Sequence, residues 1–217
     1  MTNNNQPKET KIKDWIFRIK TPSQKADASK LMLLLHGHLG NEKSMWILTK
    51  KLPKSYTFIA PRAPVKTGEN QYSWHEISQQ WPGLYHYKDL AEMLLDRVHK
   101  WCEDNEIECN RFDVMGFSQG AVMAYALAFL YPEEVGKVAA LASFIPQGWK
   151  SEIDPRSIEN KSFFIAHGTE DEIIPIQKAS KAAEWLNENG ADIRFCKADI
   201  GHKLSADCFK GLGNFFE

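Results

Sequence analysis

The segment Gly116-x-Ser118-x-Gly120 combines the residue types of a catalytic serine turn. A short apolar stretch, residues 111–115, precedes it, and an almost wholly apolar stretch, residues 121–130, follows it. This order predicts a strand, a tight turn with the serine at its tip, and a buried helix, which together form a nucleophile elbow. Glycine on both sides of the serine avoids collisions with the neighbouring strand and helix. The free N–H groups at the start of that helix would face an oxyanion forming beside Ser118.

A serine hydroxyl needs a base that takes its proton and an acid that orients the base. Open parallel sheets place functional groups at the carboxyl ends of their strands. Asp171 follows a predicted strand at 162–166, and His202 follows a predicted strand at 193–196. The order Ser, Asp, His is the one that this kind of elbow requires. The sequence therefore predicts Ser118, Asp171 and His202 as a catalytic triad.

Each partner of the serine also has a structural interpretation. Asp171 could brace a turn, and His202 could be a surface residue at the start of a helix. Asp199 is a rival acid because it lies three residues before His202, and Glu170 adjoins Asp171. We expect an acid on a separate strand end to approach the far side of the imidazole ring, which favours Asp171. Of the competing histidines His36, His75 and His167, the first and last directly abut strands and are predicted to brace loops, and His86 and His99 are predicted to be solvated.

The elements that must position these residues alternate between strands and helices. Strands are predicted at 30–35, 56–61, 111–115, 138–143, 162–166 and 193–196, with an antiparallel edge strand at 15–19. Helices are predicted at 42–51, 86–105, 121–131, 176–189 and from 201–202 to about 216. This alternation predicts an α/β fold with a mostly parallel sheet covered on both faces. The long connection at 65–85 has no periodic pattern, and 144–160 looks irregular.

Composition limits the class of protein. The chain has 217 residues, a net charge of −1 and no basic stripe, so nucleic acid is not an expected partner. Residues 1–10 are polar and are predicted to be a flexible tail, and 11–217 a single domain. The polar N-terminus and the shortness of every apolar run predict a cytoplasmic protein without a membrane span. The four cysteines, at 102, 109, 196 and 208, show no pairing motif and are predicted to be reduced.

Several motifs, in order, resemble the phospholipase/carboxylesterase family, which includes small bacterial carboxylesterases and acyl-protein thioesterases. They are Leu35-His36-Gly37, Ala60-Pro61-Arg62-Ala63-Pro64, Ser73-Trp74-His75-Glu76-Ile77, Gly116-Phe117-Ser118-Gln119-Gly120, the stretch from His167 to Pro175, and Gly201-His202. The resemblance extends from about residue 30 to 216. It implies the α/β-hydrolase fold and the triad of Ser118, Asp171 and His202.

The same resemblance implies the rest of the site. The oxyanion donors would be the main-chain N–H groups of Gln119 and His38, with Leu39 as the alternative because family members often carry leucine where His38 stands. Trp74 and Leu39 are the expected substrate-binding residues, although Trp74 could equally hold a long loop in place. The family needs no metal or cofactor.

The predicted function is that of a serine carboxylesterase, which cleaves carboxylic esters through an acyl-enzyme on Ser118. The partner is a small-molecule ester, and a homodimer is left open. The alternative within the enzyme class is an acyl thioesterase or lysophospholipase that acts on long acyl chains. A binding module on the same fold is the third hypothesis, but such a module would not need a complete triad.

Overall fold

The computed structural model describes residues 6–22, 30–76, 78 and 80–217. Within these residues an eight-stranded sheet has the order β1-β2-β4-β3-β7-β8-β9-β10. The strands are β1 (Lys8–Ile12), β2 (Trp15–Lys20), β3 (Leu31–Leu35), β4 (Thr57–Pro61), β7 (Phe112–Phe117), β8 (Val135–Leu141), β9 (Ser162–Gly168) and β10 (Asp192–Ala198). The strands from β4 to β10 in this order run parallel, and β1 and β2 are antiparallel. The predicted α/β-hydrolase fold with a mostly parallel sheet is confirmed.

Strand β3 shows why the centre of the sheet reads as one apolar run. All of its side chains are buried. Leu31, Leu33 and Leu35 pack into one core, whereas Met32 and Leu34 pack into a second core on the opposite face. Successive side chains of a strand point to opposite faces, so a strand covered on both sides must be apolar at every position.

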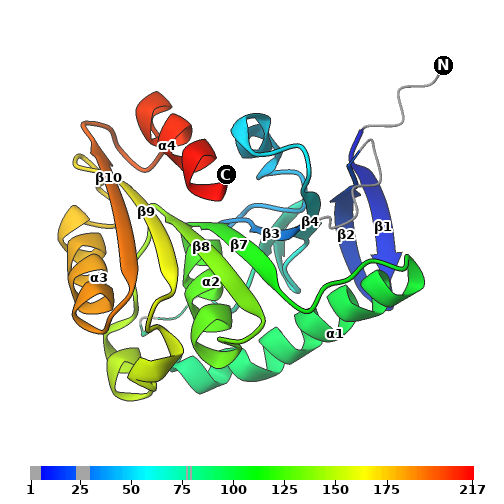
Figure 1. The fold of residues 1–217 in the computed structure, drawn as a ribbon, viewed down its shortest axis with the longest axis horizontal. Helices are drawn as coiled ribbons and strands as arrows, with labels where there is room; N and C mark the ends of the chain where they lie inside the picture. The colour runs from blue at the N-terminus through cyan, green and yellow to red at the C-terminus, as the bar shows by residue number, and fades with distance from the viewer. Residues whose placement is uncertain (1–5, 23–29, 77, 79) are drawn as a thin grey trace.

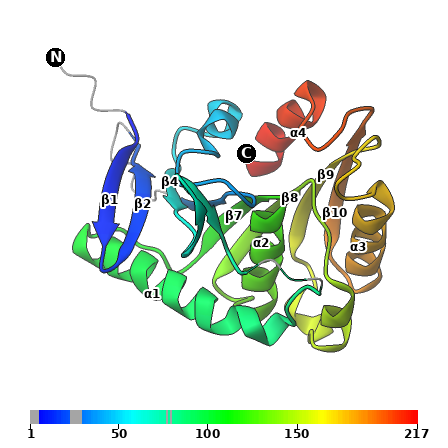
Figure 2. The ribbon, with the colours of Figure 1, turned by 180° about the vertical axis from the view of Figure 1, so that it is seen from behind.

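The helices form two layers around this sheet (Figures 1 and 2). One face is covered by α1 (Lys88–Asp104), α2 (Gln119–Leu130) and α3 (Ile176–Glu188). The other face is covered by the short 3-10 helix η1 (Trp46–Lys51) and by α4 (Ala206–Phe216). Helix α2 is buried over 119–129 because it lies between the sheet and α1, which explains its apolar character on every side.

Several expected boundaries differ from the structure. The helix predicted at 42–51 is the 3-10 helix η1, which begins at Trp46, and the strand predicted at 138–143 is β8, which spans Val135–Leu141. Residues 8–10, predicted to belong to the tail, begin β1, so β1 and not β2 is the outer strand; residues 1–5 lie outside the described residues. The connection predicted to lack structure contains the hairpin β5 (Val65–Gly68) and β6 (Gln71–Ser73), followed by η2 (Leu84–Tyr87). Two further short helices, η3 (Gln147–Ser151) and η4 (Pro155–Ser157), lie in the irregular segment.

The β5–β6 hairpin is fixed to the loop that follows β3. The Tyr72 N–H donates to the Gly40 carbonyl at 3.0 Å. The Arg62 guanidinium pairs with the buried Glu42 carboxylate at 2.7 Å and lies over the Tyr72 ring. These contacts bring the end of β6, and with it Ser73 and Trp74, next to the serine turn.

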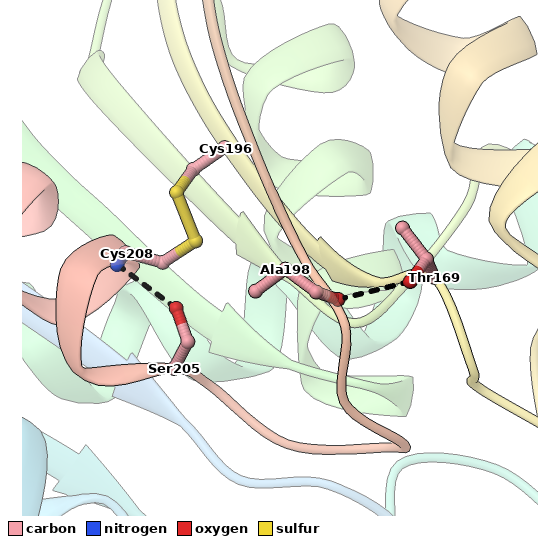
Figure 3. The surroundings of a disulfide bond; sticks show 5 residues. All are labelled: Thr169, Cys196, Ala198, Ser205 and Cys208. Atoms are coloured by element: carbon pink, nitrogen blue, oxygen red, sulfur yellow. Dashed lines mark hydrogen bonds between the residues drawn. A yellow bond between two sulfur atoms is a disulfide. The ribbon is translucent and has the colours of Figure 1, made fainter.

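The prediction of four reduced cysteines is wrong for one pair. Cys196 on β10 and Cys208 in the first turn of α4 form a disulfide (Figure 3), whereas Cys102 and Cys109 are free. No local spacing motif signals this bond, because the two sulfur atoms meet only when α4 folds back over β10.

None of the described helices has both the length and the apolar character that a membrane crossing requires.

Candidate active site

Ser118 occupies the sharp turn between β7 and α2. Its backbone angles are φ 53° and ψ −119°, a region that side-chain-bearing residues rarely adopt. The turn is held by the Ser118 N–H, which donates to the Leu141 carbonyl at 2.8 Å, and by the Ser143 hydroxyl, which donates to the Ser118 carbonyl at 2.9 Å. The serine is therefore placed at the carboxyl edge of the sheet by contacts with the neighbouring strand.

The two glycines of the turn are required by close backbone approaches. A Cβ atom on Gly116 would lie 2.2 Å from the Gly120 carbonyl oxygen. A Cβ atom on Gly120 would lie 2.1 Å from the Leu35 carbonyl oxygen. No side chain fits at such distances, so the predicted nucleophile elbow has the geometry that its glycines indicate.

Asp171 and His202 are joined directly. Asp171 lies three residues beyond β9, and His202 lies in the loop between β10 and α4. The His202 Nδ1 is 2.7 Å from the Asp171 Oδ2, while the Asp171 Oδ1 accepts the N–H groups of Ile173 and Ile174 at 3.0 and 2.9 Å. Both carboxylate oxygens therefore have donors, and the Nε2 of His202 is left for another partner.

The surroundings of Asp171 favour its charged form. Burial by itself raises the pKa of this carboxyl, but the hydrogen bonds from the Ile174 amide and from His202 outweigh burial and hold the pKa below its ordinary value. A buried carboxylate that keeps its charge near neutral pH can stabilise a positively charged imidazole.

The rival acids are placed elsewhere. Asp199 is exposed and accepts the Thr169 hydroxyl at 2.8 Å, so it braces the loop that carries it. Glu170 is exposed, and its main-chain N–H donates to the Ile200 carbonyl. Neither carboxylate is hydrogen-bonded to the His202 ring in the described residues, and the geometry agrees with Asp171 as the partner of that ring.

Two buried histidines brace the site. The His167 Nε2 lies 2.7 Å from the Ile174 carbonyl oxygen and 3.3 Å from the Asp171 Oδ2, so it supports the loop that holds the acid. The His36 Nε2 accepts the Ala63 N–H at 3.1 Å. Burial lowers the pKa of His36 to about 4, so this residue is neutral near pH 7.

Ser118 and His202 face one cavity without a hydrogen bond between their side chains. The Phe117 ring packs edge-on against the His202 imidazole, with ring centres 5.0 Å apart. The imidazole is 15% exposed, which leaves it open towards the cavity. Contacts between nucleophile and base are often loose in unliganded hydrolases and shorten when substrate binds.

The expected oxyanion donors lie at the same edge. In the part of the chain that the structure describes, the main-chain N–H groups of Gln119, His38 and Leu39 donate no hydrogen bond to another residue. Residues 37–40 form a turn in which the Gly40 N–H donates to the Gly37 carbonyl at 3.0 Å and Leu39 has a φ of 64°. The structure keeps both His38 and Leu39 as alternatives for the second donor.

Trp74 lies behind the serine turn and is 2% exposed. Its indole N–H donates to the His36 carbonyl at 2.7 Å, and its main-chain N–H donates to the Gln119 side-chain oxygen at 3.1 Å. The Gln119 amide also bonds the Ser73 hydroxyl. Trp74 is not among the residues that line the cavity beside Ser118, so its position favours the structural interpretation, in which it holds the loop.

The cavity beside Ser118 and His202 has a volume of about 900 Å³. Leu39, which the sequence predicts to bind substrate, lines this cavity and is 48% exposed. The other apolar residues of its wall come from η1 and the residue before it, the end of β7, the loop after β9, and the start of α4 with the loop before it: Met45, Ile47, Leu48, Phe117, Ile173, Leu204, Ala206 and Phe209. Apart from Leu39, sequence reasoning missed this wall. The apolar residues that follow His202 in the sequence are the signal that could have indicated this part of the cavity wall.

Comparison with known proteins supports the same class. The sequence profile of the phospholipase/carboxylesterase family matches residues 16–217. Acyl-protein thioesterase 1 of Emericella nidulans is 29% identical over 186 residues, which cover 74% of this chain and 77% of that protein. The Candida albicans protein of the same name is 26% identical and covers 93% of this chain and 99% of its own length.

Solved structures agree at the level of the fold. The carboxylesterase of Mesorhizobium loti superimposes with a TM-score of 0.82 at 15% identity, covering 97% of this chain and 98% of its own. The Bacillus cereus carboxylesterase superimposes with a TM-score of 0.80 at 18% identity, covering 93% of each chain. With a family profile that spans nearly the whole chain, a serine elbow and an α/β-hydrolase sheet, this protein belongs to the phospholipase/carboxylesterase family and is a hydrolase of the esterase and thioesterase class.

Proposed function

We propose that this protein is a serine carboxylesterase that works through an acyl-enzyme on Ser118. The Ser118 oxygen attacks the carbonyl carbon of the ester, and His202 takes the serine proton. His202 then gives that proton to the departing alcohol. Water attacks the acyl-enzyme with the help of the same imidazole, which releases the acid and restores the serine.

The observation that carries this proposal is the 2.7 Å contact between His202 and Asp171, at the edge of a cavity that also contains the Ser118 elbow. Asp171 would hold the His202 ring in the tautomer with a proton on Nδ1 and would stabilise the imidazolium. The main-chain N–H groups of Gln119 and of His38 or Leu39 would bind the oxyanion.

Hydrolysis of long-chain acyl thioesters or lysophospholipids is the second candidate. It is favoured by the size of the cavity, about 900 Å³, and by the apolar side chains of its wall. A volume of this order holds a substrate with a long acyl chain. The two curated relatives compared above are both named acyl-protein thioesterase 1, which points the same way.

The cytoplasmic location and the homodimer stay predictions from the sequence.

The test is Ser118→Ala, assayed with nitrophenyl esters from acetyl to palmitoyl and with an acyl-thioester series of the same lengths. We expect activity to fall about 10⁴-fold or more, because the nucleophile is lost, while the thermal midpoint stays nearly unchanged. A fluorophosphonate should label the wild type on Ser118 and leave the variant unlabelled. Substantial hydrolysis by the variant would contradict the assignment, and the ratio of ester to thioester turnover in the wild type decides between the two candidates.

A further inference from the structure

The disulfide between Cys196 and Cys208 encloses the loop that carries His202. Cys196 lies on β10, and Cys208 lies in the first turn of α4, with His202 at the middle of the intervening segment. Figure 3 shows the bond between the strand and the helix, beside the Ser205 side chain that caps α4. The covalent link therefore joins the two elements from which the histidine loop leaves and to which it returns.

The first half of this loop is fixed by main-chain contacts with the end of β9. The Thr169 N–H donates to the Ala198 carbonyl at 2.8 Å, and the Glu170 N–H donates to the Ile200 carbonyl at 3.1 Å. A Cβ atom on Gly168 would lie 2.1 Å from the Ile200 carbonyl oxygen, so the loop packs closely on this strand. These contacts position the chain as far as the residue before His202.

The second half of the loop depends on the start of α4. In the first turn of this helix, Ala206 and Asp207 are exposed and Phe209 is partly exposed towards the cavity, so Cys208 is the buried side chain of the turn. The other buried residues of α4 come from its C-terminal half, starting at Leu212. The sulfur bridge is therefore a covalent attachment of the helix start to the sheet, in addition to the packing of Leu204 and Phe209 against the same core.

The same turn also forms part of the cavity wall. Leu204, Ser205, Ala206 and Phe209 line the cavity beside Ser118. Movement of the start of α4 would change both the orientation of the His202 ring and the space for the acyl chain. Misplacement of a catalytic group by about 1 Å can cost on the order of a hundredfold in rate.

We propose that Cys196 and Cys208 are positioning residues of the active site. Their disulfide holds His202, and the part of α4 that lines the cavity, in position relative to Ser118. This inference deepens the proposed function and rests on it. A dithiol reductant reverses the arrangement: the S–S bond gains two electrons and two protons, giving two cysteine thiols, and the reductant is oxidised to its cyclic disulfide. Reduction would therefore lower catalysis in the folded protein.

The first measurement is a thiol count of the unfolded, unreduced enzyme. We expect two reactive thiols, Cys102 and Cys109, and four after treatment with dithiothreitol. Four thiols before treatment would overturn the proposal, because the bond would not exist in solution. Far-UV circular dichroism at the assay temperature confirms that the reduced enzyme is still folded.

The second measurement is turnover of the oxidised and reduced enzyme. We expect kcat to fall about tenfold to a hundredfold on reduction and to recover on reoxidation. Cys208→Ser and Cys196→Ser should each show the lowered kcat and no further response to the reductant. The matched control, Cys102→Ser, should keep both the activity and the response. An unchanged kcat with only a lowered thermal midpoint would show that the bond merely stabilises the fold, and would overturn the proposal.

Amide hydrogen exchange tests the positioning role of the disulfide independently of the proposed function. Reduction should speed amide exchange in residues 199–209 and leave residues 116–122 unchanged, whether or not the assayed substrates are turned over. If the oxidised enzyme hydrolyses none of the esters or thioesters, the proposed function fails, and exchange still tests the positioning role. Equal exchange of residues 199–209 in the two redox states would overturn that role.

Discussion

Asp171 has a donor for each carboxylate oxygen, and this distinguishes it, among the described residues, from the neighbouring acids Asp199 and Glu170. Two main-chain N–H groups fix its Oδ1, and His202 contacts its Oδ2. The buried His167 lies against the same oxygen from the other side. A carboxylate held in this way cannot rotate away from the imidazole, so its role depends on charge and position together.

Asp171→Asn tests that role. We expect kcat to fall on the order of 10⁴-fold, because an amide can donate to Nδ1 and thereby impose the wrong tautomer on His202. Asp199→Asn and Glu170→Gln, the matched controls, should each cost less than about tenfold. The measurement is kcat at several pH values for the three variants. If kcat falls severely in Asp199→Asn and stays close to the wild-type value in Asp171→Asn, the acid has been misassigned.

The three residues proposed as the triad could be singled out from the sequence because each follows a strand in a fixed order. The contacts that support these residues could not be specified in the same way. The sequence predicts that His167 braces a loop, but its partner, the Ile174 carbonyl, and the contact between the Gln119 side chain and Trp74 follow only from the tertiary structure. Trp74 illustrates this ambiguity. From the sequence alone, an aromatic residue in a long loop could line a substrate pocket or hold the loop in place.

Two of the elements that line the cavity, η1 and α4, lie on the same face of the sheet. Phe209 from α4 and Ile47 from η1 contribute to its wall, and Ile47 is 57% exposed. Their separation sets the width available to an acyl chain. Substitutions on these elements should therefore alter substrate length and leave the chemistry at Ser118 intact.

Phe209→Ala should widen the cavity and move the preferred acyl length upwards, whereas Ile47→Trp should narrow it and favour short chains. The expected change in relative kcat/KM is about 1–3 kcal/mol, the range for a misfit of one or a few methylene groups. Lys210→Ala, an exposed neighbour on α4, is the control and should leave the preference unchanged. The acyl panel from acetyl to palmitoyl measures these shifts. The same length profile in all three variants would place the acyl chain outside this cavity.

The start of α4 explains why this wall was not predicted. Gly201 and His202 look like the opening of a helix in the sequence, but Ser205 is the residue whose side chain caps it, accepting the Cys208 N–H at 3.1 Å. The intervening residues form the histidine loop and part of the cavity. The β5–β6 hairpin was not predicted because its strands are short and lie outside the large sheet.

The buried His36, which braces the site, also affects the free energy of unfolding of the whole chain. It is fully buried, and its Nε2 accepts the Ala63 N–H, which a protonated ring could not do. Burial lowers its pKa from 6.5 to about 4. The unfolded chain therefore binds more protons than the folded chain between these values, so the free energy of unfolding must fall as the pH falls through this window.

His36→Gln should flatten that pH dependence. In the wild type this residue is expected to remove up to about 3 kcal/mol between pH 6.5 and 4, and the variant lacks the titrating group. Urea unfolding at several pH values in this range measures the slope. His86→Gln, at an exposed histidine, should keep the slope of the wild type. Equal slopes for wild type and His36→Gln would show that another group controls the acid sensitivity.

The order of the sheet has a consequence for how the protein behaves among copies of itself. Among the described residues, the outer strands β1 and β10 each pair with one neighbouring strand, so each has an edge that could pair with another chain. Exposed charged residues occur along both: Lys8, Glu9 and Lys11 on β1, and Asp192, Arg194 and Lys197 on β10. A second molecule that extended the sheet would have to remove these charges from water. The apolar strands thus lie at the centre, and the margins resist fibrous aggregation during folding and at high concentration.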